Sequence, residues 1–215
     1  MRLYCDLCVA PRGRAEAEEL ARLYRLMGVR WVAVEAGDPA AARGLAEVFR
    51  AYGVEAVTRV TLEASEWGDA VKRLKRLAEE YDVVVVRPRS AEAARLAARD
   101  PRVAAVQLPP GMARYMDKSQ AALLRESGAV VELRLRVLLG GGDPRLGLRG
   151  VMVAARRAAA YEAAFAVSSC ARSRWEAWPP MTVVGLLVSF GVPPPVARLS
   201  VSGYCLQALR RGLRG

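Results

Sequence analysis

The feature that most constrains this chain is a repeated alternation between short apolar runs and longer amphipathic segments. The clearest run is Asp82–Arg87, whose four successive valines indicate a strand buried on both faces, as in a parallel sheet. Ser90, a residue type that caps helices, then precedes the amphipathic segment Ala91–Arg99. Seven units of this kind follow one another, which predicts repeated βα units with parallel strands.

The repeat places each expected element along the chain. The expected strands are Arg2–Val9, Arg30–Glu35, Val54–Thr61, Asp82–Arg87, Val103–Gln107, Ala129–Val137 and Phe165–Ser169. The expected helices are Arg14–Met27, Pro39–Tyr52, Glu66–Tyr81, Ala91–Arg99, Asp117–Ser127 and Arg145–Glu162, followed by a helical C-terminal region. Seven units without a linker predict one α/β domain over residues 1–215, a TIM-barrel-like fold of about seven parallel strands with extra C-terminal helices. A doubly wound open sheet is the alternative.

Charge points to the kind of partner. Lys and Arg number 33 against 22 Asp and Glu, which gives a net charge of +11. Nearly all of the positive charge is arginine, whose planar fork grips phosphate and stacks on bases. This excess predicts a polyanionic partner such as RNA. The apolar run Met181–Phe190 is too short to span a bilayer, so no membrane partner and a cytoplasmic location are expected.

Missing residue types limit the chemistry. The chain contains no His, which excludes triads, dyads and metal sites that depend on imidazole. It also contains no Asn, a thermolabile residue, which fits a protein that must survive heat. Cys5 and Cys8 are three apart on an expected strand and should face opposite sides. Together with Cys170 and Cys205 they are predicted to be buried free thiols, and no metal site or catalytic residue is predicted.

Polar residues at alternate strand positions are expected inside the barrel. The interior set is Asp6, Glu35 and Glu132 together with Arg59, Arg87, Gln107, Arg134 and Arg136. One interpretation is an active or anion-binding site at the carboxyl ends of the strands. The interpretation we favour is a structural ion network built on Asp6, Glu35 and Glu132, because unpaired buried charge is costly.

Arginines near strand ends and loops are the candidates for RNA contact. The predicted RNA-binding residues are Arg59, Arg87, Arg89, Arg134, Arg136, Arg172 and Arg174. The last two lie beside Trp175 and Trp178, a mixture suited to stacking on unpaired bases. The alternative is that the two tryptophans dock the last helices onto the barrel. Gly140-Gly141-Gly142 fits no nucleotide-binding pattern and is expected to be a flexible loop.

The order of several short motifs resembles the ribonuclease P protein component 3 family, the barrel-like subunit of archaeal and eukaryotic ribonuclease P. The motifs are Tyr4–Val9, Arg59–Leu62, Arg95–Ala97, Met116–Asp117, Val131–Leu139 and Ser168–Ala171. Two departures stand out: the family commonly has Gly in place of Cys170, and Ala177–Pro180 replaces its usual Leu-Arg-Ser-Pro. The family looks distantly related to metal-dependent phosphoesterase barrels that open with Asp-x-His-x-His. Here Asp6–Ala10 lacks both histidines, so that metal site should be lost.

The resemblance implies an RNA-binding subunit that supports the catalytic RNA in removing 5′ leaders from precursor tRNA. It implies that Mg²⁺ sits on the RNA and that the protein has no intrinsic cofactor and no complete active site. The implied partners are the catalytic RNA, an RRM-like subunit called ribonuclease P protein component 2 and, indirectly, precursor tRNA.

Two other functions remain open from the residues alone. One is a metal-dependent phosphoesterase-like barrel enzyme that acts on a phosphorylated small molecule through Asp6, Glu35 and Glu132. The other is a scaffold whose basic charge reflects only the composition of its genome.

Overall fold

Seven parallel strands form one sheet in the computed structural model, which describes residues 3–139 and 143–213. The strands are β1 (Tyr4–Val9), β2 (Val29–Glu35), β3 (Glu55–Ala64), β4 (Val83–Pro88), β5 (Val103–Gln107), β6 (Val130–Arg134) and β7 (Phe165–Ser168). They lie in sequence order, and each pairs in parallel with the next. This consecutive order confirms the predicted TIM-barrel-like fold and shows that the doubly wound alternative is wrong.

The sheet curls until its last strand reaches its first. Val9 forms a parallel bridge with Ala171, and the Ala10 amide donates to the Ala171 carbonyl at 2.8 Å. The Cys170 amide likewise donates to the Cys8 carbonyl at 2.8 Å. The seam therefore closes near the carboxyl ends of β1 and β7.

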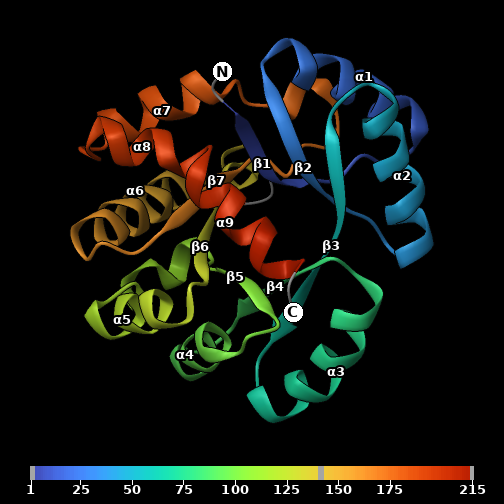
Figure 1. The fold of residues 1–215 in the computed structure, drawn as a ribbon. Coiled ribbons are helices and arrows are strands. Elements are labelled where there is room, and N and C mark those ends of the chain that lie inside the picture. The colour runs from blue at the N-terminus through green and yellow to red at the C-terminus, as the bar shows by residue number, and fades with distance from the viewer. Residues whose placement is uncertain (1–2, 140–142, 214–215) are drawn as a thin grey trace.

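Helices surround the strands, as Figure 1 shows. They are α1 (Arg14–Leu26), α2 (Pro39–Ala51), α3 (Trp67–Glu80), α4 (Ala91–Arg99), α5 (Lys118–Ser127), α6 (Pro144–Ala160), α7 (Pro180–Ser189), α8 (Pro194–Ser200) and α9 (Gly203–Gly212). Ser90 caps α4 by accepting from the Ala93 amide, and Asp117 caps α5 by accepting from the Gln120 amide. The helical C-terminal region is confirmed.

The sixth strand is shorter than predicted. It ends at Arg134, and Leu135–Leu138 form a short 3-10 helix, η2, instead of continuing the strand. Leu135 is buried in the main core, so the turn of η2 places an apolar side chain inside while the chain leaves the sheet. Two predictions concern residues outside the described part of the chain: the start of the first strand at Arg2, and the loop at Gly140–Gly142.

Helix α9 closes the amino-terminal end of the barrel, and the described residues contain no eighth strand. Figure 1 shows this helix lying across the strand ends. Its buried Cys205, Ala208 and Leu209 pack in one cluster with interior strand residues. Several of these strand positions are alanines, which leave room for the helix: Ala33, Ala104, Ala105 and Ala166. The lower half of the barrel, at the amino-terminal ends of the strands, is therefore apolar. No helix in the described ranges is long and apolar enough to cross a membrane.

The prediction of free thiols is wrong, because all four cysteines form disulfides. Cys5 on β1 is joined to Cys205 on α9, and Cys8 is joined to Cys170 after β7. The two cysteines of each disulfide lie 200 and 162 residues apart in the sequence, so no local sequence pattern predicts the pairing. Cys170 also has φ +48°, a conformation that favours glycine, the residue common at this position in the family it resembles. Disulfides of this kind also occur in intracellular proteins of hyperthermophilic archaea.

We predict that the Cys5–Cys205 disulfide contributes strongly to stability. A crosslink across a loop this long stabilises a fold by about 5 kcal/mol in the chain-entropy account, because it restricts the unfolded chain. Cys205→Ser should therefore lower the calorimetric melting temperature, and a reductant should lower that of the unaltered protein at least as far. Equal melting temperatures for the oxidised and reduced protein would contradict this account.

Candidate functional site

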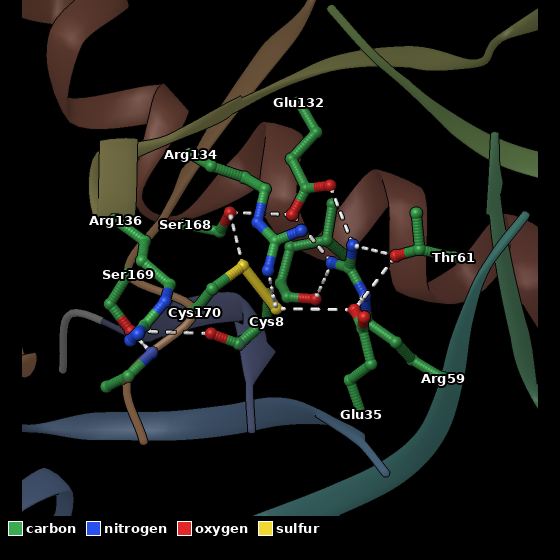
Figure 2. Close-up of a disulfide and its surroundings, with 12 residues drawn as sticks. Cys8, Glu35, Arg59, Thr61, Glu132, Arg134, Arg136, Ser168, Ser169 and Cys170 are labelled. Carbon is green, nitrogen blue, oxygen red and sulfur yellow. Dashed lines mark hydrogen bonds and ion pairs between the residues drawn. A yellow bond between two sulfur atoms is a disulfide. The ribbon is translucent and has the colours of Figure 1, made fainter. Parts of the chain in front are cut away.

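Arg59 on β3 lies at the centre of the polar half of the barrel. Its side chain is 0% exposed. Its Nε donates to Glu35 Oε2 at 2.9 Å, and its two terminal nitrogens donate to Glu132 at 2.6 and 2.8 Å. The remaining donors reach the Leu7 carbonyl and Thr61 Oγ1. Every N–H of the guanidinium is thus bonded, in the bidentate geometry that suits arginine and carboxylate (Figure 2).

Glu132 on β6, like the arginine that it binds, is fully buried and held by several hydrogen bonds. It also accepts from Ser168 Oγ at 2.6 Å and from Gln107 Nε2 at 3.0 Å. Burial alone would raise the pKa of this carboxyl, but the charge and hydrogen bonds of Arg59 outweigh burial and lower the pKa. The same pairing raises the pKa of Arg59 in spite of its burial. Both groups therefore stay charged at neutral pH.

Asp6 lies outside this network, contrary to the prediction that it belongs there. It accepts from Tyr24 Oη at 2.8 Å and from the amides of Cys8 and Ser169 at 3.1 Å. The pairing of β1 with β2 shifts register between Asp6 and Val9, so strict alternation fails in this strand. Asp6 consequently turns towards α1, and burial raises the pKa of its carboxyl.

The prediction that Arg59 contacts RNA is also wrong, because the side chain is fully enclosed. The other six candidates keep some exposure, and five of them line a cavity at the carboxyl ends of the strands. Arg174 is the remaining candidate, and it does not belong to the lining of this cavity.

The cavity has a volume of about 400 Å³ and lies where barrel proteins place their functional groups. It is lined by five arginines and by Gln107 together with an apolar set. The full lining is Arg87, Arg89, Gln107, Leu108, Pro109, Pro110, Leu133, Arg134, Arg136, Val137, Gly150, Val151 and Arg172. No Asp or Glu belongs to this lining in the part of the chain that the structure describes. The surface of the cavity is therefore strongly cationic.

Three of the five arginines are paired with carboxylates from outside the cavity. Arg87 and Arg89 both bind Glu63 on β3, at 2.5 and 2.8 Å, and Arg136 binds Glu176. Neither glutamate was predicted as a site residue. Glu63 continues the alternation of Arg59 and Thr61 along β3, and it was missed because the predicted strand ended at Thr61. Glu176 follows the exposed Trp175, and no sequence signal marked it.

Arg134 and Arg172 have no carboxylate within ion-pair distance in the described ranges. Arg134 lies deep in the mouth, where its Nη2 is 3.9 Å from Cys8 Sγ (Figure 2). Burial lowers the pKa of this guanidinium, although Glu132 opposes that effect. Arg172 is exposed at the rim. The cavity thus holds two cations that are not neutralised by a direct ion pair.

Each of the two tryptophans fits a different one of the two interpretations, base stacking or docking of the last helices. Trp175 is 80% exposed, and the Arg174 guanidinium lies 4.5 Å from the centre of its ring. Trp178 packs against the main core, as the docking interpretation requires. Trp175 therefore offers a free aromatic face beside the basic rim, whereas Trp178 fixes the C-terminal region.

A group of potential metal ligands occurs below the cavity but does not suit a cation. Cys8, Cys170 and Glu132 bring ligand atoms within 4.8 Å of one another. The two sulfurs are joined as a disulfide, and Glu132 is already held by Arg59. Arg134 would also repel a metal ion. The residues present fit an anion better than a metal.

Fold and site together define a class: a (β/α) barrel protein with an arginine-lined mouth and no histidine. The chain belongs to the RNase P subunit p30 family, whose model matches residues 3–214. It is a protein subunit of ribonuclease P.

Two similar proteins agree with this membership. Ribonuclease P protein component 3 of Aeropyrum pernix is 29% identical over 195 residues, which cover 87% of this chain and 88% of that protein. A chain in a structure described as archaeal ribonuclease P with mature tRNA has a TM-score of 0.79 at 12% identity. The match covers 97% of this chain and 90% of that one, and it supports the fold.

We predict that breaking the Arg59–Glu132 pair strongly destabilises the protein. Glu132→Gln should destabilise the protein by about 3–5 kcal/mol, because it leaves a buried guanidinium with one carboxylate partner. The double variant Arg59→Met with Glu132→Leu should be more stable than Glu132→Gln in urea unfolding, because it removes both charges. A double variant that is less stable than Glu132→Gln would contradict the assignment.

The same network predicts a dependence on pH. The folded-state pKa of Glu132 lies below its ordinary value of 4.5, so its ion pair contributes fully above that pH. The contribution should be lost as the pH falls through the lowered pKa. Urea unfolding between pH 7 and pH 3 should show this loss in the unaltered protein, and a smaller loss in Glu132→Gln.

Proposed function

We propose that this subunit supports the catalytic RNA of ribonuclease P by offsetting phosphate repulsion at the mouth of the barrel. The observation that carries the proposal is the cavity with five arginines and, among the described residues, no carboxylate in its lining. Arg134 and Arg172 keep their charge available there, and Trp175 adds an exposed ring for stacking. The reaction supported is the removal of 5′ leaders from precursor tRNA.

The chemistry of cleavage is proposed to belong to the RNA with its bound Mg²⁺, not to the protein. The carboxylates that a phosphoesterase-like barrel would need are occupied: Glu35 and Glu132 bind Arg59, and Asp6 accepts from Tyr24. Groups held in this way are poor ligands for a metal and poor general bases. We therefore propose that the protein has no intrinsic cofactor and no complete active site.

The remaining partners follow from the resemblance. We propose that an RRM-like ribonuclease P protein component 2 binds this chain directly, and that precursor tRNA is reached through the catalytic RNA. The protein is proposed to function in the cytoplasm. The archaeal ribonuclease P structure with mature tRNA, which contains a chain of the same fold, supports the RNA partners.

Reconstitution tests the proposal directly. Cleavage of precursor tRNA by the cognate catalytic RNA is measured across Mg²⁺ concentrations, with and without this chain and its component 2 partner. The chain should lower the Mg²⁺ concentration needed for half-maximal cleavage, because its arginines replace cations that otherwise screen phosphates. Arg172→Met should lose part of this effect, whereas Arg73→Met, which removes an exposed charge on α3, should keep it.

An unchanged Mg²⁺ requirement, in a preparation shown by its melting curve to be folded, would overturn the proposal. Equal losses from Arg172→Met and Arg73→Met would show that only overall charge matters and that the mouth of the barrel has no specific role.

A further inference from the structure

The cavity at the mouth has two chemically different sides. The basic side comes from the ends of β4 and β6 and from the segment after β7, where Arg87, Arg134 and Arg172 lie. The apolar side comes from the turn between β5 and the 3-10 helix η1 (Pro110–Tyr115), from η2 and from α6. Its residues are Leu108, Pro109, Pro110, Val137 and Val151. A phosphate and a base would each find a suitable surface here.

The apolar side is built by close packing of two elements. A Cβ on Gly150 of α6 would lie 2.4 Å from Pro110 Cα and 2.8 Å from its carbonyl oxygen. Only glycine lets α6 approach the turn after β5 this closely. The wall is therefore a fixed feature of the fold rather than an accidental gap between side chains.

We infer that this cavity holds one unpaired nucleotide, with its phosphate at Arg134 and Arg172 and its base against the apolar side. The inference rests on the proposed function and deepens it, because it names the form of RNA that enters the mouth. A volume of about 400 Å³ is within the usual range of small-ligand sites. A duplex is too wide to enter, whereas a base from a loop or bulge can be turned outward and inserted.

The charges of the cavity favour a phosphate on this pair of arginines. Arg87 and Arg89 are already bonded to Glu63, and Arg136 is bonded to Glu176. Arg134 is partly buried and has no ion-pair partner among the described residues, and burial penalises its charge. A phosphate bound by its guanidinium and by that of Arg172 would remove this penalty through charge-assisted hydrogen bonds.

The site should accept any base. Gln107 is the one amide side chain among the described residues of the lining, and both of its ends are occupied. Its oxygen accepts from Arg87 and its nitrogen donates to Glu132. Reading a base edge needs free donors and acceptors, which the prolines, leucines and valines do not supply. Affinity should therefore depend on the phosphate and on apolar contact.

Binding to the full chain, free of RNA, tests the inference. AMP, UMP, adenosine and inorganic phosphate are titrated by calorimetry at low salt. AMP and UMP should bind alike and about tenfold more tightly than inorganic phosphate, the ratio expected when roughly 60 Å² of apolar surface is buried. Adenosine should bind far more weakly than either nucleotide. Equal affinity for inorganic phosphate and both nucleotides would overturn the inference, because it would show a simple anion site.

Matched variants separate the two sides of the cavity. Val137→Trp, which fills the apolar side, should weaken AMP about tenfold and leave inorganic phosphate unchanged. Arg134→Met and Arg172→Met should each weaken both ligands, and Arg73→Met should weaken neither. Melting temperatures check that each variant is folded. If Arg134→Met does not fold, Arg172→Met alone tests the basic side. Unchanged AMP binding in Val137→Trp would contradict the placement of the base.

Failure of this inference and failure of the proposed function give different results. If the unaltered chain lowers the Mg²⁺ requirement of the catalytic RNA but does not bind AMP, the nucleotide site is wrong and the proposed function stands. If the chain binds AMP as expected but leaves the Mg²⁺ requirement unchanged, the cavity is a nucleotide site and the proposed role in ribonuclease P is wrong.

Discussion

Arg59 is fully buried with every N–H bonded, and the arrangement of the rest of the mouth depends on this saturation. The guanidinium uses the carboxylates of Glu35 and Glu132, which come from strands on either side of the barrel interior. A buried charge of this kind is tolerated only when it is paired and hydrogen-bonded. Because these two carboxylates are bonded to Arg59, they form no direct ion pair with the arginines that line the cavity. The mouth consequently remains cationic.

The barrel is divided along its axis by this network. Below it, α9 and small strand residues form an apolar plug, fixed to β1 by the Cys5–Cys205 disulfide. Above it, five arginines line an open cavity, and Trp175 lies exposed nearby. The Cys8–Cys170 disulfide lies at the boundary and joins β1 to the segment after β7. The apolar plug and the Cys5–Cys205 disulfide thus lie at the end opposite the cavity, and the upper half presents charge to a polyanion.

The sequence predicted the strands and helices well because each unit carries its own local pattern, as the valines of β4 and the caps at Ser90 and Asp117 illustrate. It also placed Glu35 and Glu132 inside the barrel, where strand alternation is regular. Asp6 was misplaced because β1 shifts register, which depends on how that strand meets β2. The disulfides depend on contacts between residues far apart in the chain, and so do the bonds that enclose Arg59 and keep it from RNA; no spacing rule encodes these contacts.

The central claim is that RNA meets the mouth of the barrel, and crosslinking in the reconstituted enzyme tests it most directly. A photoreactive benzoylphenylalanine replaces Trp175 at the mouth or Leu26, which is 85% exposed at the end of α1 that leads into β2. Irradiation should crosslink the catalytic RNA to the protein labelled at position 175, with little product from position 26. Crosslinks from position 26 that equal or exceed those from position 175 would contradict the account.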